Sequence, residues 1–458
     1  MQSTDLDAFP CSLPPGQQRH IMVALIRQAV TQLERWHEDA PQRLPLPRSM
    51  AMPPVAPAPW GLDAARLMAD LDLVVRGSYN PWHPGAMAHL DPPPNPASVA
   101  GDLVCGWLNN NMLAEELSPL LSRLERRLLG WIAQRLGLGD NAGGVMASGG
   151  TICTITALVT ARHQRGLDGQ QVCLYASADC HNSLAKALRV MGLPATALRL
   201  APTDDAGRLD PHLLDQALET ETDPILAVVA TAGTTVRGAV DPIGPMADIC
   251  RRRGLWLHVD GAVGAVCGLG GRRHQERVAH MGRADSLTMN PQKWLGIAKT
   301  SAMVLLRQPQ GLADAFAAPL AYMEPARVVH GGDCGLQGTR PAEVLKLWLG
   351  LRHLGQHGIE ELLDGALQRA RTLRQALAPL PLIMPSGDLH IVCFRPRTAG
   401  NSEAWSRHTR ELLLDQGLML SRPRYRGQHH LKAVLGNPFT GVEQIAAVAD
   451  TVAASLSR

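Results

Sequence analysis

Between about residues 96 and 348, this 458-residue chain alternates short apolar runs with helical patterns, and this alternation constrains its fold more than any other feature. The apolar runs are rich in β-forming residues and lie at residues 171–175, 225–230, 255–259 and 301–306. Helical patterns separate them, for example at residues 120–136 and 151–162. Strands that alternate with helices are typical of a mostly parallel sheet covered by helices on both faces. The sequence therefore predicts an α/β fold.

Two further regions flank this segment. A first helix is expected near residues 18–38, and the proline-rich stretch 41–60 should be an extended connector. After residue 348, the pattern predicts another α/β unit, with helices near 365–377, 402–416 and 441–457 and strands at 389–394 and 430–435. We therefore predict an N-terminal helical and extended segment (1–95), a large domain (96–348) and a small C-terminal domain (349–458).

Charge and cysteine content narrow the class of protein. The net charge is only +3, so no overall field favours nucleic acid as a partner. Nine cysteines without a C-x-x-C pair favour a reducing cytoplasm over secretion, and no metal site is predicted. We expect no signal peptide, and no run of about 18 apolar residues predicts a membrane span.

The first candidate functional residue is Asp260, which ends an apolar run and is followed by the small residues Gly261 and Ala262. Ligands of open α/β sheets bind outside the carboxyl ends of the strands. An acid among apolar neighbours needs a cationic partner, and a protonated pyridine nitrogen is one. The alternative is that Asp260 caps the next helix.

The second candidate is Lys293, which stands in a proline-containing turn beside Trp294. If the lysine is buried among apolar and aromatic groups, the pKa of its amine falls, which favours Schiff-base chemistry. The alternative is a surface lysine whose stem covers Trp294.

Three further turns lie beside predicted strands. Gly149 and Gly150 precede a helix, whose free N–H groups could bind a phosphate. Thr235 could meet a polar ring substituent or merely cap the backbone, and His181 could be catalytic or structural. A phosphate turn, a His, a Thr pair, an Asp and a Lys along one sheet are the parts that a pyridoxal cofactor needs.

Taken together, these motifs resemble those of the group II pyridoxal-phosphate-dependent amino acid decarboxylases, which act on glutamate, aromatic amino acids, diaminobutyrate or sulfinoalanine. Residues 148–151 resemble the phosphate turn of that family, 230–243 its A-T-x-G-T-T…D-P-I segment, 258–262 its H-V-D-A-A motif and 290–294 its N-P-H-K-W motif. Residues 83–94 and 336–348 resemble two further signatures. The resemblance runs from about Asn80 to Phe439.

The resemblance implies fold type I, the aspartate aminotransferase-like fold, with pyridoxal 5'-phosphate as cofactor. It implies decarboxylation of an L-amino acid to the amine and carbon dioxide, through a Schiff base on Lys293. Asp260 would pair with the ring nitrogen and His181 would stack on the ring. The other implied cofactor contacts are Gly150, Thr151, Thr235, Ala262, Asn290 and Gln292, the last of which replaces a His of many relatives.

The sequence also departs from the family pattern. Relatives carry a loop Tyr that returns a proton to the substrate carbon, but this chain has Val329, followed by His330. We expect His330 to be the proton donor, with Lys293 or water as the alternatives. Lys432 stands where relatives bind the substrate carboxylate with an Arg. His83 and Glu116 are further candidates for substrate binding, or else ordinary interface residues.

These departures keep other outcomes open. Besides amine release, the same scaffold could carry out decarboxylation-dependent oxidative deamination to an aldehyde, or act as a carbon–carbon lyase. A catalytically idle homologue is a further alternative, which the retention of both Lys293 and Asp260 argues against. The resemblance also implies a homodimer whose active sites lie at the two-fold interface.

Overall fold

The computed structural model describes residues 14–58, 60–318, 329–397 and 402–456. Its centre is a seven-stranded sheet with the strand order β1-β7-β6-β5-β4-β2-β3. The strands are β1 (Gly143–Ala147), β2 (Cys173–Ser177), β3 (Leu198–Ala201), β4 (Ile225–Thr231), β5 (Leu257–Gly261), β6 (Ser286–Met289) and β7 (Ala302–Leu306). Strands β3, β2, β4, β5 and β6 are parallel, and β7 runs antiparallel to both β6 and β1. The predicted mostly parallel sheet is confirmed.

Helices cover both faces of this sheet, and together they form the seven-stranded unit. The helices are α4 (Pro119–Arg135), α5 (Gly150–Gln164), α6 (Ser183–Val190), α7 (Pro211–Thr220), α8 (Ile243–Arg253), α9 (Arg272–Gln275), α10 (Pro291–Trp294) and α11 (Gln310–Phe316). Short 3-10 turns connect them, namely η3 (Glu115–Leu117), η4 (Ala195–Ala197), η5 (Ala265–Leu269), η6 (Glu276–Val278), η7 (Met281–Arg283) and η8 (Gly331–Cys334).

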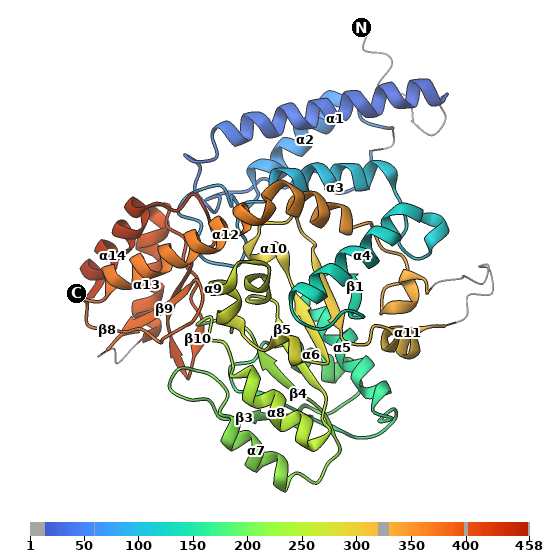
Figure 1. Ribbon diagram of the computed structural model, residues 1–458. Helices are drawn as coiled ribbons and strands as arrows, with labels where there is room; N and C mark the ends of the chain where they lie inside the picture. The colour runs from blue at the N-terminus through green and yellow to red at the C-terminus, as the bar shows by residue number, and fades with distance from the viewer. Residues whose placement is uncertain (1–13, 59, 319–328, 398–401, 457–458) are drawn as a thin grey trace.

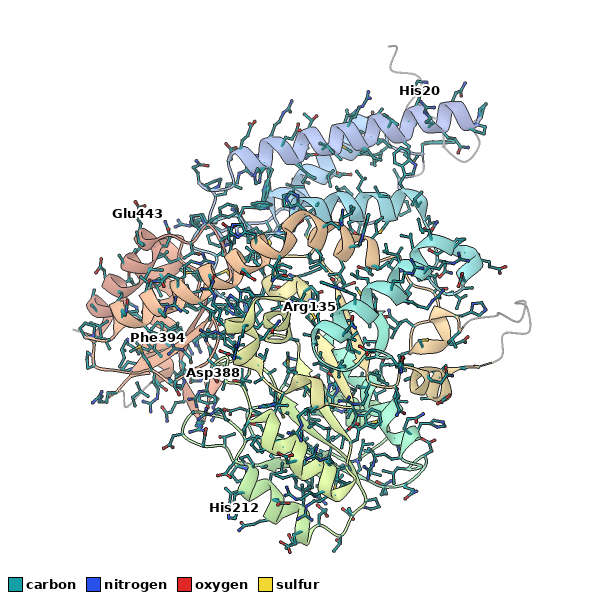
Figure 2. The ribbon with its side chains drawn as sticks, viewed as in Figure 1. His20, Arg135, His212, Asp388, Phe394 and Glu443 are labelled. Atoms are coloured by element: carbon teal, nitrogen blue, oxygen red, sulfur yellow. The ribbon has the colours of Figure 1, made fainter. Side chains whose placement is uncertain are left out.

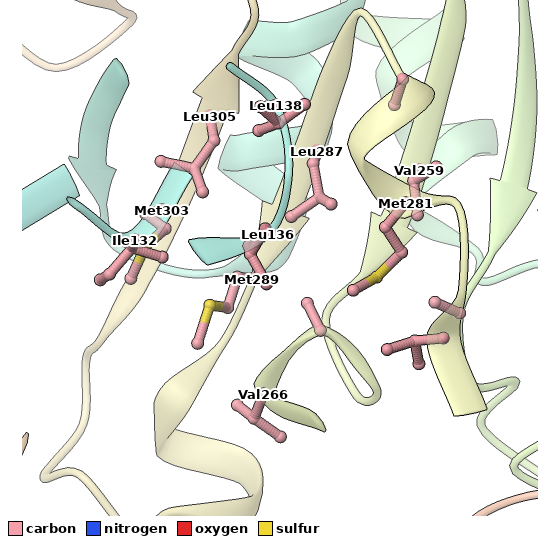
Figure 3. Close-up of a cluster of buried hydrophobic side chains, with 14 of the residues drawn as sticks. Ile132, Leu136, Leu138, Val259, Val266, Met281, Leu287, Met289, Met303 and Leu305 are labelled. Atoms are coloured by element: carbon pink, nitrogen blue, oxygen red, sulfur yellow. The ribbon is translucent and has the colours of Figure 1, made fainter. Parts of the chain in front are cut away.

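The alternation of side chains along a strand explains the two-faced packing. Val228 and Ala230 of β4 pack in a buried cluster with α4 and α8, whereas Ala227 and Val229 pack in another with α5 and α6. Successive side chains of a strand point to opposite faces, so a strand covered on both sides must be apolar throughout. Figure 3 shows the first cluster, which includes Leu287 of β6.

A second, smaller layer stands beside the first and is called the three-stranded unit (Figure 1). Its antiparallel sheet has the order β12-β9-β8. The strands are β8 (Leu382–Ile383), β9 (Ile391–Pro396) and β12 (Leu431–Val434), and a hairpin is formed by β10 (Arg424–Tyr425) and β11 (Gln428–His429). Helices α13 (Ser402–Asp415) and α14 (Val442–Leu456) cover it. Phe394, labelled in Figure 2, is fully buried in its core.

Helix α12 (Val344–Leu377) joins the two units and begins about 20 residues before the predicted helix. Its backbone is non-helical at Gly355, where φ is 58°. The predicted domain boundary after residue 348 falls inside α12, and the division into three domains stays a prediction. Asp388, labelled in Figure 2, marks another junction of the units, because its carboxylate accepts a hydrogen bond from Val240 N at 2.9 Å.

The N-terminal region contributes α1 (Pro15–Glu38), α2 (Ala64–Arg76) and α3 (Pro96–Leu108). Helix α1 corresponds to the predicted first helix, and no helix or strand occurs among the described residues of the connector 41–60. Helix α3 packs against α12, while α1 and α2 lie at the outer edge of the molecule (Figure 1). In the described part of the chain, no helix combines the length and the apolar character needed to cross a membrane.

One buried ion pair fastens α4 to the segment that leads into α12. The guanidinium of Arg340 donates to the Glu125 carboxylate at 2.8 and 2.6 Å, and both side chains are about 5% exposed. Met146 N of β1 also donates to Glu125 at 3.3 Å. The pair therefore connects three segments that are distant in sequence.

Replacing one partner of this pair should destabilise the protein strongly. In Arg340→Met the Glu125 carboxylate stays buried without its cation, so we expect the free energy of unfolding to fall by about 3–5 kcal/mol. Urea unfolding followed by circular dichroism measures this. The control is Arg272→Ala, whose side chain is 92% exposed and pairs with Glu276; it should change the free energy by less than about 1 kcal/mol. Equal changes in both variants would contradict the expectation.

Candidate active site

A cavity of about 220 Å³ lies at the carboxyl ends of the parallel strands. The nine residues predicted to contact a cofactor all line it, namely Gly150, Thr151, His181, Thr235, Asp260, Ala262, Asn290, Gln292 and Lys293. They follow β1, β2, β4, β5 and β6, which explains how segments 140 residues apart meet at one edge of the sheet. Ser183, Thr231, Gly233 and Val263 complete the lining.

Lys293 reaches the cavity from α10, the short helix after β6. Its neighbour Trp294 is 1% exposed and stacks on His390 with 3.8 Å between the ring centroids, which anchors this turn in the core. Burial lowers the pKa of Lys293, and the negative charge of Asp260 opposes that shift in part. A larger fraction of the amine is therefore neutral, the form that can attack a carbonyl carbon.

Asp260 ends β5 with 8% of its surface exposed, and its carboxylate accepts a hydrogen bond from Ala262 N at 3.1 Å. Among the described residues, no side chain forms an ion pair with it. A carboxylate buried without a protein cation is costly unless a bound group supplies the positive charge. The protonated ring nitrogen of a pyridine cofactor fits this requirement.

His258, two residues earlier on the same strand, cannot supply that charge. Burial lowers the pKa of His258 to about 4, so its ring is neutral near pH 7. Its two ring nitrogens lie 2.8 Å from Ser286 Oγ and 3.4 Å from Thr288 Oγ1, both on β6. These hydroxyls satisfy the neutral ring, so His258 adds no positive charge beside Asp260.

Another part of the cavity lining, at the start of α5, suits an anion. Gly150 and Thr151 begin α5, whose first N–H groups carry the positive end of the helix dipole. In the amide orientation that satisfies both of its groups, Asn290 accepts from Gly150 N at 3.2 Å. A Cβ at Gly150 would lie 3.1 Å from the Asn290 amide, so glycine keeps this cradle open.

Two hydroxyls and a histidine complete the cavity. Ser183 Oγ and Thr231 Oγ1 are buried and have no hydrogen-bond partner among the residues that the structure describes, so both can bind a ligand. The sequence analysis missed them, although Ser183 lies two residues after His181 and Thr231 directly follows the apolar run 225–230. The His181 ring accepts from Ser183 N at 3.1 Å, and burial lowers its pKa. A neutral, half-buried ring of this kind can stack on a planar cofactor.

Lys432 lies beside the cavity without lining it. It is 6% exposed on β12 of the three-stranded unit, and its ammonium donates to Thr235 O at 3.3 Å. Burial lowers the pKa of Lys432, and the charge of Lys293 adds to that effect. The predicted carboxylate-binding cation is thus next to the predicted cofactor site.

The three remaining candidates do not line this cavity. His330 precedes η8, next to a second cavity of about 260 Å³ that Val329 and Gly331 line. The His83 ring accepts from Gly85 N at 2.9 Å in the N-terminal region, and Glu116 is exposed on η3. Their predicted roles stay predictions, because none of the three lines the cavity that contains Lys293.

Comparisons with known proteins agree with this geometry. Residues 50–397 match the family described as "Pyridoxal-dependent decarboxylase conserved domain". The chain is 31% identical to cysteine sulfinic acid decarboxylase of Rattus norvegicus, over 68% of this chain and 66% of that protein. It is 30% identical to L-2,4-diaminobutyrate decarboxylase of Rhizobium meliloti (strain 1021), over 81% of this chain and 77% of that protein.

Solved structures show the same fold. Mouse CSAD superposes with a TM-score of 0.88 at 24% identity, over 95% of this chain and 98% of that one. Oryza sativa TDC with PLP and tryptamine superposes with a TM-score of 0.87 at 23% identity, over 97% of this chain and 99% of that one. The prediction of fold type I is confirmed.

The lowered pKa of Lys293 should be measurable in the apoprotein. We expect the rate at which acetic anhydride labels Lys293 to rise with pH around a midpoint below that of free Nα-acetyl-lysine amide in the same tube. Peptide mass spectrometry gives both rates. Asp260→Asn removes the charge that raises the pKa of Lys293, so its midpoint should fall further. A wild-type midpoint at or above that of the free amine would contradict the expectation.

Proposed function

This chain belongs to the pyridoxal-dependent decarboxylase family, and we propose that it decarboxylates an L-amino acid, using pyridoxal phosphate bound in the cavity at Lys293. The observation that carries the proposal is the convergence of a buried lysine with a lowered pKa and a buried, unpaired carboxylate in one cavity that also offers an anion cradle. Each part matches one chemical group of the cofactor: the aldehyde, the ring nitrogen and the phosphate.

Each group of residues in the cavity would contact a different part of the cofactor. Asp260 would hold the ring nitrogen protonated, and His181 would cover the ring face. Gly150, Thr151 and Asn290 would hold the phosphate. When bound, pyridoxal phosphate supplies an electron sink for the electron pair that remains on the substrate α-carbon after carbon dioxide leaves.

Lys293 and Lys432 would act on the substrate side. Burial lowers the pKa of Lys293, so its amine would serve as the nucleophile for the cofactor carbonyl and could take up or release a proton. Lys432 would attract the α-carboxylate as a single point charge, because an ammonium lacks the two-pronged geometry of an arginine. Its bond to Thr235 O would fix that charge beside the ring site.

We further propose that the active protein is a homodimer, which would let His330, His83 and Glu116 of one subunit approach the cavity of the other. Large apolar side chains are exposed on the N-terminal helices, and on α3 these are Val99, Leu103, Val104, Trp107 and Leu108, each 41–51% exposed. An exposed apolar face of this kind is typical of an interface. The eight cysteines of the described residues are all free, which supports our proposal of a cytoplasmic location.

The test of the proposed function begins with the cofactor. Purified protein should show a visible absorption band that borohydride removes, with the reduced pyridoxyl label on Lys293. Carbon dioxide release should then be measured with a panel of L-amino acids. Lys293→Ala should lose the label and at least about 10³-fold of the activity, since no other amine replaces the nucleophile.

The exposed Lys186 provides a control, because Lys186→Ala leaves the cavity lining unchanged. That variant should keep both the label and the turnover. Label on a different lysine would refute the assignment of Lys293, and a labelled protein that releases no carbon dioxide from any amino acid would refute the decarboxylase activity.

The product depends on how the α-carbon regains its proton. Val329 has no acidic group, so we propose that His330 donates the proton. His330→Phe should lower amine formation by about 10²–10⁴-fold, the usual contribution of a positioned acid. The ratio of amine to aldehyde and ammonia, measured by chromatography, should shift toward the aldehyde. Aldehyde as the main product of the wild-type protein would instead favour oxidative deamination, and an unchanged amine rate in the variant would exclude His330.

A further inference from the structure

The hairpin β10–β11 of the three-stranded unit inserts one tyrosine into the seven-stranded unit. Tyr425 is 8% exposed, and its hydroxyl donates to Asp179 Oδ2 at 2.7 Å. The same hydroxyl accepts from the Arg237 guanidinium at 3.0 Å. One oxygen atom therefore joins an anion and a cation that come from different loops of the other unit.

Both of these loops end at the cofactor cavity. Asp179 lies two residues before His181, and Arg237 lies two residues after Thr235. His181 and Thr235 both line the cavity, and both are predicted contacts of the cofactor ring. Each hydrogen-bond partner of the Tyr425 hydroxyl is thus two residues along the chain from a predicted ring contact. Tyr425 itself does not line the cavity.

The Arg237 side chain is held firmly in place by further hydrogen bonds. It is 2% exposed, and its guanidinium also donates to Ser386 O at 2.9 Å, Ser386 Oγ at 3.1 Å and Asp205 O at 3.0 Å. Asp179 is held more weakly: in the described part of the chain, its carboxylate accepts a hydrogen bond from Tyr425 alone. Loss of the hydroxyl should therefore release the Asp179 loop more than the Arg237 loop.

We propose that Tyr425 is a positioning residue. Its hydroxyl holds the loops that carry His181 and Thr235 in place against the three-stranded unit, and the positions of these two residues determine how well the cofactor ring binds. This inference rests on the proposed function in one respect, that the cavity holds pyridoxal phosphate. Lys432 also helps to hold Thr235 against the three-stranded unit, since its ammonium donates a hydrogen bond to Thr235 O. Hydrogen bonds to charged groups are strong enough for such a role.

The test compares Tyr425→Phe with a matched control. Tyr175→Phe removes a similar bond, in which a 6% exposed tyrosine donates to the Glu221 carboxylate at 2.8 Å, away from the cavity. Each apoprotein is titrated with pyridoxal phosphate, and the circular dichroism of the bound cofactor is recorded in the visible range. We expect Tyr425→Phe to weaken cofactor binding about 10-fold and to reduce the dichroic signal. Tyr175→Phe should stay within about 2-fold of wild type.

A second variant keeps the proposal testable if Tyr425→Phe does not fold. Asp179→Asn retains the tyrosine and should weaken cofactor binding in the same direction. Where all variants fold, the double variant should lose less than the sum of the two single losses, because both remove one interaction. Wild-type binding and dichroism in Tyr425→Phe, or in Asp179→Asn if that variant alone folds, would overturn the proposal. Equal losses in Tyr425→Phe and Tyr175→Phe would also overturn it.

The readout separates this inference from the proposed function. A wild-type protein that fails to bind pyridoxal phosphate would refute the proposed function, and with it the premise of the inference. A wild-type protein that binds the cofactor while the Tyr425 and Asp179 variants bind it equally well would refute the inference alone.

Discussion

The rest of the site depends on the burial of one carboxylate. Asp260 is placed at the end of a central parallel strand, where β4 and β6 flank it and where no described side chain neutralises it. Its strand neighbour His258 is kept neutral by burial, and two hydroxyls of β6 lie within hydrogen-bonding distance of its ring nitrogens. A bound cation would offset the cost of holding this carboxylate in the core. Cofactor binding and the stability of this edge of the sheet should therefore be linked, since the ligand supplies what the protein lacks.

The two units of the chain are held together at the same edge that carries the site. Lys432 and Tyr425 extend from the three-stranded unit to the loop after β4, and Asp388 binds the backbone of that loop at Val240. These contacts are polar and largely buried, so each depends on accurate geometry. The position of the three-stranded unit therefore affects the loop after β4, which carries part of the cofactor site.

A single subunit leaves the reaction incomplete on our proposal. Val329 cannot return a proton, and His330 lies beside a different cavity of its own subunit. The apolar side chains exposed along α3 are where a second copy would cover the molecule. On this proposal, return of the proton would depend on dimer formation, because the same interface would bury the apolar face of α3 and bring His330 to the substrate.

The sequence by itself determined the α/β class, four strands of the seven-stranded sheet and the order of its motifs, and the family resemblance implied nine of the residues that line the cavity. Periodicity identifies strands that are apolar on both faces, and the carboxyl ends of parallel strands always meet at one edge. The pattern does not predict strands β1, β3 and β6. Gly144 of β1 is required where a Cβ would meet Val304 O, β3 has only four residues and includes Arg199, and Ser286 and Thr288 of β6 serve the ring of His258. Only the tertiary structure decided these contacts, the hydrogen bonds of Tyr425 and the place of His330 outside the lining of the Lys293 cavity, because each depends on segments more than 25 residues apart, which a local pattern does not record.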